Sequence, residues 1–144
     1  MTQLPEELVR DLLRENGMLD AFVDYRGRDR DAPVLQLFEF REDSLQTDQR
    51  CVFIRMTGDS SVTPHLIQNH QVVVGFVGLN VDSDIPVARF RADEIYNFFL
   101  DNFTQCQMHG LVPSRPGQPY TLGSKRRVFE ITVDIQIGRE AAQP

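Results

Sequence analysis

The chain has 144 residues, of which 41% are hydrophobic and 25% charged, and its net charge at pH 7 is −6. This length is typical of one domain with its own core, and an acidic chain lacks the basic stripe that binding to nucleic-acid phosphates requires. No apolar run reaches the roughly 18–20 residues of a membrane-spanning helix, and Glu6 and Glu7 argue against a signal peptide. We expect a soluble protein with no membrane partner, no sequence-specific nucleic-acid binding, and two free, reduced cysteines, Cys51 and Cys106.

Residues 5–16 are predicted to form the first helix. Pro5 suits a first helical turn, and Gly17 supplies the left-handed residue that often ends a helix. Four apolar residues fall on one side of this helix and would pack on a sheet, namely Leu8, Val9, Leu12 and Leu13.

The segments that follow are mostly polar. Residues 18–25 predict a short turn or strand, and residues 26–31, Arg-Gly-Arg-Asp-Arg-Asp, alternate in charge and predict a solvated loop. Residues 33–40 have an imperfect strand pattern. Residues 41–50 are polar throughout and predict a loop.

Two strands are predicted in the middle of the chain. The first covers residues 51–57, with Val52, Ile54 and Met56 on one face, and we expect it to end in a turn at residues 58–61. Residues 62–69 are predicted to form a short helical crossing. The second strand covers residues 71–79; it is apolar on both faces, which is typical of a strand in the middle of a sheet.

The main helix is predicted over residues 86–102, with Ser83 or Asp84 as its cap and Pro86 in its first turn. A core-facing stripe recurs at three- and four-residue spacing and consists of Ala88, Ala92, Ile95, Phe99 and Phe103. Residues 106–125 contain several prolines and glycines and predict a long loop, of the kind that is often functional.

The last regular element is the clearest in the chain. From Phe129 to Ile137 every odd residue is apolar and every even residue is polar, which is the pattern of a half-buried strand over residues 126–138. A short disordered tail is expected at 139–144. Together the elements predict one α+β domain over residues 1–144, with a mixed, largely antiparallel sheet of about four to five strands and helices on one face.

No segment carries a convincing enzymatic site. Gly58-Asp59-Ser60 resembles the nucleophile segment of GDS-type esterases, but the late Asp-x-x-His of that family is missing, and the residue after Ser60 is not the glycine of trypsin-like proteases. His65 and His70 are five residues apart, off the spacing that places two metal ligands on one helix face. We expect no enzymatic activity, no metal and no cofactor.

Three segments together resemble the tail terminator (tail completion) proteins of long-tailed bacteriophages, and their order also resembles minor capsid proteins of the phage neck. They are the apolar strand that ends in Thr57-Gly58, the strand over residues 72–79 followed by a turn and a helix, and the Pro/Gly-rich segment 113–123 that leads into the alternating final strand. The likeness is one of order and pattern over most of residues 1–138.

The resemblance implies a structural virion protein. Proteins of that family form a ring, usually a hexamer, that caps the tail tube, ends its polymerisation and joins it to the head-side connector. It implies self-association, partners in the tail tube protein and a connector or neck protein, DNA passing through the ring, synthesis in the cytoplasm of the bacterial host, and a final location at the tail–neck junction. Ring closure would join one patch on each copy to a different patch on the next.

Exposed, irregular segments are the candidate subunit or neck contacts. The candidates are Arg26, Arg28, Arg30, Gly58, Asp59, Pro113, Arg115, Tyr120, Lys125, Arg126 and Arg127. The paired arginines 126 and 127 have two interpretations: they pair with acids of a neighbouring copy, or they begin a solvated strand. For the whole chain the alternatives are a monomeric ligand- or partner-binding domain with the Pro/Gly segment as a lid, and a small hydrolase using Ser60.

Overall fold

The computed structural model describes residues 3–62, 67–102, 108–114 and 116–138, and for residues 58–62, 67–68, 108–111 and 137–138 it describes the backbone alone. The helices and 3₁₀ turns are α1 (Pro5–Glu15), η1 (Glu42–Ser44), η2 (Asp82–Asp84) and α2 (Ile85–Asp101). The strands are β1 (Phe22–Val23), β2 (Asp29–Arg30), β3 (Val34–Leu37), β4 (Cys51–Val62), β5 (Ile67–Val77), β6 (Met108–Pro113), β7 (Tyr120–Thr121) and β8 (Arg127–Gly138).

The main sheet has six strands in the order β3-β4-β5-β8-β6, with β7 also pairing with β8. All neighbours are antiparallel except β3 and β4, which are parallel. The two-stranded hairpin β1–β2 stands apart from it. The predicted α+β class and the mixed, largely antiparallel sheet are confirmed, and the sheet contains six strands instead of the expected four to five.

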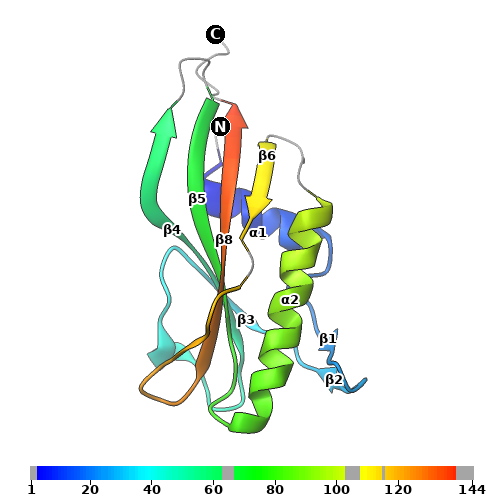
Figure 1. Cartoon of the computed structure of the whole chain (residues 1–144). Coiled ribbons are helices and arrows are strands. Elements are labelled where there is room, and N and C mark those ends of the chain that lie inside the picture. Colours follow the sequence, from blue (N-terminus) through cyan, green and yellow to red (C-terminus); the bar gives the residue numbers. More distant parts are fainter. Residues whose placement is uncertain (1–2, 63–66, 103–107, 115, 139–144) are drawn as a thin grey trace.

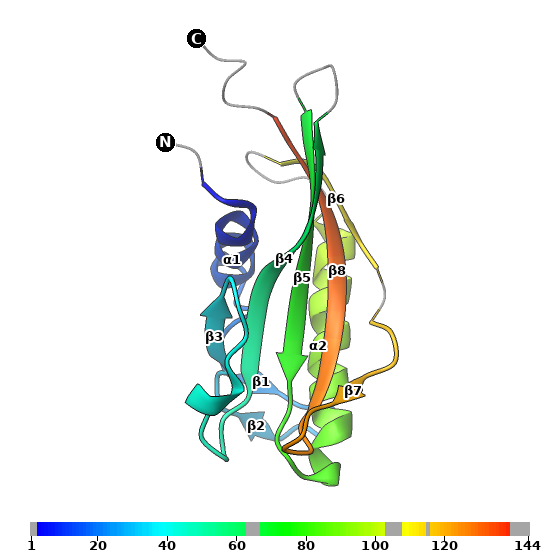
Figure 2. The same cartoon turned by 90° about the vertical axis from the view of Figure 1, so that its left-hand side faces the viewer.

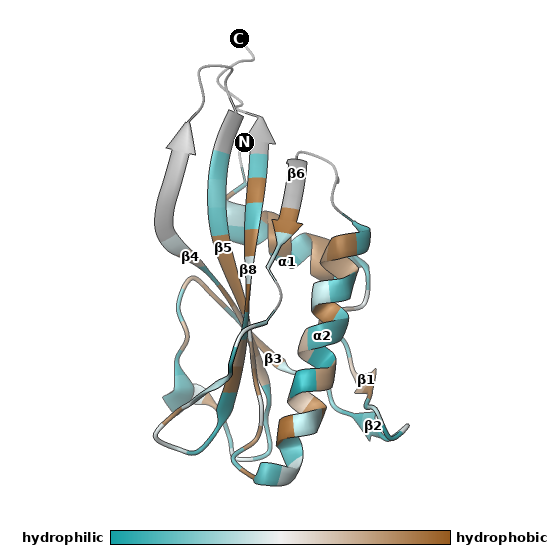
Figure 3. Ribbon diagram, viewed as in Figure 1, coloured by the Kyte–Doolittle hydropathy of each residue, from teal (hydrophilic) through white to brown (hydrophobic). Residues whose placement is uncertain are grey.

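Both helices lie on the same face of the sheet (Figures 1 and 2). Leu8, Val9, Leu12 and Leu13 of α1 are buried, as their spacing predicts, and α2 contributes Ala88, Ala92, Ile95 and Phe99 to the same core. The hydropathy colouring shows the apolar residues concentrated where the strands pass the helices (Figure 3). This layer is the main core of the domain.

The opposite face of the sheet has a smaller core at one end. Cys51, Phe53, Val73, Val77 and Val128 are buried there, and the covering side chains are Phe40, Leu45 and Leu122 from the connecting segments. Beyond this cluster the same face is polar. This arrangement explains why β5, the central strand, is apolar on both sides, whereas β8 alternates.

Two predictions for residues 58–69 are wrong. Residues 58–61 do not turn the chain; they continue β4 to Val62, and Ser60, Ser61 and Val62 pair with His70, Asn69 and Gln68. The expected helical crossing over 62–69 is absent from its described residues, which belong to β4 and β5. The pairing register shifts between Met56 and Ser60. Glycine and polar residues therefore mark a bulge here, which the sequence pattern does not distinguish from a turn.

The prediction of a continuous loop over 106–125 is also wrong. This segment contains β6 and β7, which pair along one edge of β8 at residues 133–137 and 127–128 respectively. Between them Ser114 donates a backbone hydrogen bond to the carbonyl of Thr132 (2.7 Å). Pro113 is tolerated because it ends an edge strand. Cys106, Phe103 and the expected tail at 139–144 lie outside the described residues.

Candidate functional site

The predicted loop at residues 26–31 is the end of the β1–β2 hairpin. Arg26 and Arg28 are exposed, and Arg30 is half-buried. The buried carboxylate of Asp24 organises the turn: its Oδ1 accepts hydrogen bonds from the backbone N–H groups of Arg26 (2.8 Å) and Arg28 (3.0 Å), and its Oδ2 accepts one from Nε of Arg30 (2.9 Å). Arg30 is therefore committed within its own hairpin, whereas Arg26 and Arg28 are available to a partner.

The pKa of Asp24 reflects two opposing effects. Burial raises the pKa, but the backbone hydrogen bonds from Arg28 and Arg26 and the ion pair with Arg30 together outweigh it, and the net pKa lies below the ordinary 3.8. The hairpin also packs on α2 through Tyr25, whose ring lies 6.4 Å from that of Phe90. The hairpin therefore has a defined conformation: residues 26–29 are exposed, as predicted, but Asp29–Arg30 form strand β2 where a loop was predicted.

Tyr120, Glu130 and Arg55 form a polar cluster on the sheet face opposite the helices. The Tyr120 hydroxyl donates to Oε2 of Glu130 (2.8 Å), and Nη2 of Arg55 lies 3.2 Å from the same oxygen. Partial burial together with the neighbouring carboxylate raises the pKa of Tyr120 to about 12. The phenol therefore stays neutral and acts as a hydrogen-bond donor at physiological pH.

The two consecutive arginines occupy opposite environments. Arg126 is buried, and its guanidinium donates to the carbonyls of Gln49 (2.6 Å), Gln46 (2.7 Å) and Gly78 (3.0 Å). Arg127 is half-buried, donates to the carbonyl of Lys125 (3.0 Å) and lies 3.9 Å from Asp82. Both interpretations offered for Arg126 are therefore wrong: it holds its own chain together, and a neighbouring copy cannot reach it. Arg127 keeps its candidacy as a contact residue.

A second buried arginine, Arg50, binds the carboxylate of Asp84, the residue that precedes α2. Asp84 occupies the cap position but makes no side-chain capping bond. Its carboxylate instead pairs with the guanidinium of Arg50 and accepts the backbone N–H of Leu79 (2.7 Å). With Arg126, this ion pair fixes the segments at the lower end of the sheet in Figure 1, including the chain just before β4. Buried charges persist only when they are paired in this way.

The remaining predicted contact residues are spread over the molecule. Gly58 and Asp59 lie in the backbone of β4, Pro113 ends β6, and Lys125 is an exposed turn residue with φ of 75°. Arg115 lies outside the described residues. The structure therefore does not bring the predicted residues together into one site. They lie on the hairpin, on one face of the sheet and along its edges.

A hollow of about 530 Å³ lies between α2 and the Pro/Gly segment. Its lining consists of Ile85, Arg89 and Asp93 from α2, Pro116, Gly117, Gln118 and Pro119, and Phe129 from β8. Arg89 and Asp93 are one helical turn apart, with a closest N–O distance of 4.0 Å, and both are exposed. A pair of this kind contributes little to stability and is available to a ligand.

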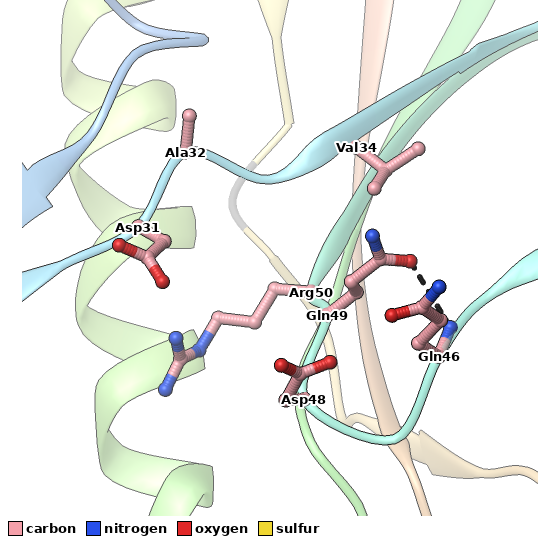
Figure 4. Close-up of a pocket in the computed structure, with 7 residues that line it drawn as sticks. All are labelled: Asp31, Ala32, Val34, Gln46, Asp48, Gln49 and Arg50. Atoms are coloured by element: carbon pink, nitrogen blue, oxygen red, sulfur yellow. Dashed lines mark hydrogen bonds between the residues drawn. The ribbon is translucent and has the colours of Figure 1, made fainter.

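A smaller hollow of about 190 Å³ lies between the start of β3 and residues 46–50 (Figure 4). The backbone N–H of Gln46 donates to Oε1 of Gln49 at its rim (3.0 Å). Asp31 and Asp48 contribute carboxylates, and the guanidinium of Arg50 is already bound to Asp84. This hollow offers no uncommitted cation to an anionic ligand.

Residues 3–62, 67–102, 108–114 and 116–138 contain no group of three His, Cys, Asp or Glu side chains arranged to hold a metal ion. In the same part of the chain, neither helix is long and apolar enough to cross a membrane. The thiol of Cys51 is buried, and burial raises its pKa to about 12, which makes it unreactive.

The sequence pattern did not reveal the two open edges of the sheet. β3 pairs with β4 only over Cys51–Ile54, so none of the described residues forms a strand beside the rest of β4 on its outer side. At the other end of the sheet, β6 is the last strand. Periodicity identifies a strand but not its neighbours, so strand order was not predictable in this way.

No protein-family model and no curated protein sequence matches the chain.

Proposed function

We propose that this chain is a structural subunit of a ring, usually a hexamer in the family it resembles, that caps the tail tube of a long-tailed bacteriophage. In this role it ends tube polymerisation, joins the tail to a head-side connector or neck protein, and resides in the virion at the tail–neck junction. The proposal contains no catalytic step, cofactor or metal. The sequence resemblance described above suggested this role, and one feature of the fold supports it.

That feature is a projecting arm of the sheet, formed by residues 57–62 of β4, 67–69 of β5 and 136–138 of β8. These strands continue past the ends of α1 and α2 (Figures 1 and 2). A sheet is stable in water when at least one face is covered, and the helices of this chain do not extend over the arm. A neighbouring copy or the tail tube would pack against the arm in place of a helix.

The charge of the chain fits the same role. A net charge of −6 opposes adhesion to DNA that passes through a ring, because phosphate binding requires clustered cations. The polar sheet face presents the carboxylates of Glu130, which pairs with Arg55, and of Asp134, which accepts a hydrogen bond from Gln71. A surface of this kind suits a channel wall that must let DNA slide.

The ring is tested by the mass of the protein in solution over a concentration series, measured by light scattering with negative-stain imaging of the same samples. We expect closed rings with a central hole, formed either by the protein alone or after addition of purified tail tubes, and a cap at one end of each tube. A protein that stays monomeric and leaves both tube ends bare would refute the proposal.

The second candidate function is a monomeric binding domain, and the 530 Å³ hollow favours it. Pro116–Pro119 would act as the lid over a ligand bound against α2, with Arg89 and Asp93 as its polar contacts. The same mass measurement separates the two functions. A monomer at all concentrations, in which a bound peptide or small molecule shifts the amide resonances of residues 116–119, would favour the binding domain.

A further inference from the structure

The two edges of the main sheet have matching geometry. On one side of the sheet, none of the described residues forms a strand along the outer side of β4 beyond Ile54; on the other side, β6 is the last strand. β4 and β6 run in opposite directions, because β4, β5, β8 and β6 are successively antiparallel. If two copies stand side by side in the same orientation, β4 of one copy therefore meets β6 of the next as an antiparallel pair.

The two edges carry few of the charges that usually guard a free edge. Soluble proteins protect exposed edge strands with charged residues, lysine above all, because unpaired N–H and C=O groups attract other strands. The open part of β4 over residues 55–62 has two charged residues, Arg55, which pairs with Glu130, and Asp59, and Met108–Pro113 contains no Lys, Arg, Asp or Glu. In β6, Val112 is 63% exposed. These are properties of edges that a partner strand covers.

Both edge strands are bulged. The register of β4 shifts between Met56 and Ser60, and that of β6 shifts between Met108 and Gly110. Bulges bend a strand and increase its twist, and they are the means by which sheets are curved towards closure. A curved sheet with two oppositely directed edges that carry few charges is suited to repetition around an axis.

We propose that the open edge of β4 pairs antiparallel with the edge of β6 of a second copy, so that the sheets of successive copies join into one continuous closed sheet. This inference rests on the proposed ring and names the surfaces that build it. The two surfaces differ, so the contact is heterologous and repeats around the ring until it closes. A foreign strand would cover one edge and leave the other exposed, whereas a second copy covers both.

Arg55 of β4 and Val112 of β6 allow a direct test. Arg55 is opposite Val73, Val73 is opposite Thr132, and Val112 is opposite Asp134. Directly opposed residues share a face, and so do residues two apart on one strand, so Arg55 and Val112 both lie on the polar face. Both are accessible. In the paired edges these two side chains would stand on neighbouring strands.

The experiment uses two single-cysteine variants of the full chain, Arg55→Cys and Val112→Cys, in a Cys106→Ser background. Cys51 is buried and unreactive, so it remains in place. The two variants are mixed, treated with a short bismaleimide, and compared with each variant alone. Val23→Cys, an exposed position on the β1–β2 hairpin away from both edges, replaces Val112→Cys in the control mixture.

We expect the yield of cross-linked dimers in the mixture of Arg55→Cys and Val112→Cys to be at least about tenfold higher than in the control mixture. Either variant alone should give few dimers. A double variant with both cysteines should give a ladder ending at the mass of the ring. Rings that form without this cross-link would overturn the edge pairing and leave the proposed ring intact. A monomer without cross-links would overturn both, and cross-links within one variant alone would replace the ring by a two-fold dimer.

Discussion

At the scale of single residues, Gly75 is required by its neighbour. Gly75 of β5 is opposite Phe53 of β4, and a Cβ atom added at position 75 would lie 2.1 Å from the Phe53 ring. The ring therefore lies directly over the backbone of β5. Because Phe53 is itself buried on the smaller core, it has no free space into which to move. Glycine usually weakens the interior of a strand, but here it makes room for the Phe53 ring.

The variant Gly75→Ala should therefore destabilise the fold by about 1–3 kcal/mol, the usual cost of overpacking a core. Gly117→Ala is the matched control, because no atom lies within 4 Å of its added Cβ. Urea unfolding followed by circular dichroism measures both. Equal stability of the two variants would show that Phe53 does not occupy the space over Gly75.

Arg126 and Arg127 provide a second comparison at this scale. Arg126→Lys keeps the charge but cannot reproduce the three carbonyl contacts of the guanidinium. Hydrogen bonds of charged groups contribute about 1.5–3 kcal/mol each, so we expect a loss of about 2–3 kcal/mol after partial rescue by the ammonium group. Arg127→Lys, with its single carbonyl contact, should lie within about 0.5 kcal/mol of wild type. Thermal unfolding of both variants measures the difference, and a reversed order would contradict the assigned roles.

At the scale of the element, the β1–β2 hairpin depends on one carboxylate. Asp24→Asn removes the negative charge that the backbone N–H groups of Arg26 and Arg28 and the side chain of Arg30 share. At neutral pH, amide hydrogen exchange at residues 26 and 28 should be faster in the variant. Asp29→Asn, an exposed change on the same hairpin, is the control and should leave exchange unaltered.

The same carboxylate predicts how the hairpin responds to acid. Because the pKa of Asp24 is lowered in the folded protein, its contribution is complete above the ordinary value of 3.8 and is lost as the pH falls through the lowered pKa. The difference in amide protection between wild type and Asp24→Asn should therefore shrink below about pH 4. A difference that is constant between pH 6 and pH 3 would show that the charge of Asp24 is not responsible.

At the scale of the whole molecule, the helix layer and the sheet have different extents. The helices cover one face except at the arm, the segments around Phe40, Leu45 and Leu122 cover the other face at the end opposite the arm, and the arm projects past both. Within the described residues, β4 beyond Ile54 has no strand on its outer side and no helix lies over the arm, and a lone domain would leave both open to other chains. An assembled subunit gains contacts from each, and the ring and edge-pairing experiments test this difference.

Much of the fold was predictable because local patterns report local surroundings. The spacing of Leu8, Val9, Leu12 and Leu13, the alternation of β8 and the two-sided apolar run in β5 each record which faces are buried. Gly17 lies just after the C-terminal end of α1 and has a φ of 75°, as expected of a left-handed residue that stops a helix. In each case the pattern that predicts the element lies within a short stretch of the chain, so it can be read from the sequence.

The candidate site was predictable only in part, because the roles of its residues depend on distant neighbours. Arg126 and Arg127 look alike in the sequence, yet only Arg126 is surrounded by the carbonyls of residues 46, 49 and 78. Asp84 looks like a helix cap, yet Arg50 is close enough to bind it. Gly58 looks like a turn, yet its strand continues because β5 pairs with both halves of β4.

The sequence by itself determined the α+β class, the two helices and the central and final strands, because side-chain periodicity follows directly from backbone geometry. The tertiary structure alone decided the order of the strands, the placement of β6 and β7 along β8, the burial of Arg126 and the two open edges. These features arise from pairings between segments far apart in the chain. Pairing of that kind depends on which faces and edges meet in the folded sheet, and no short stretch of sequence records it.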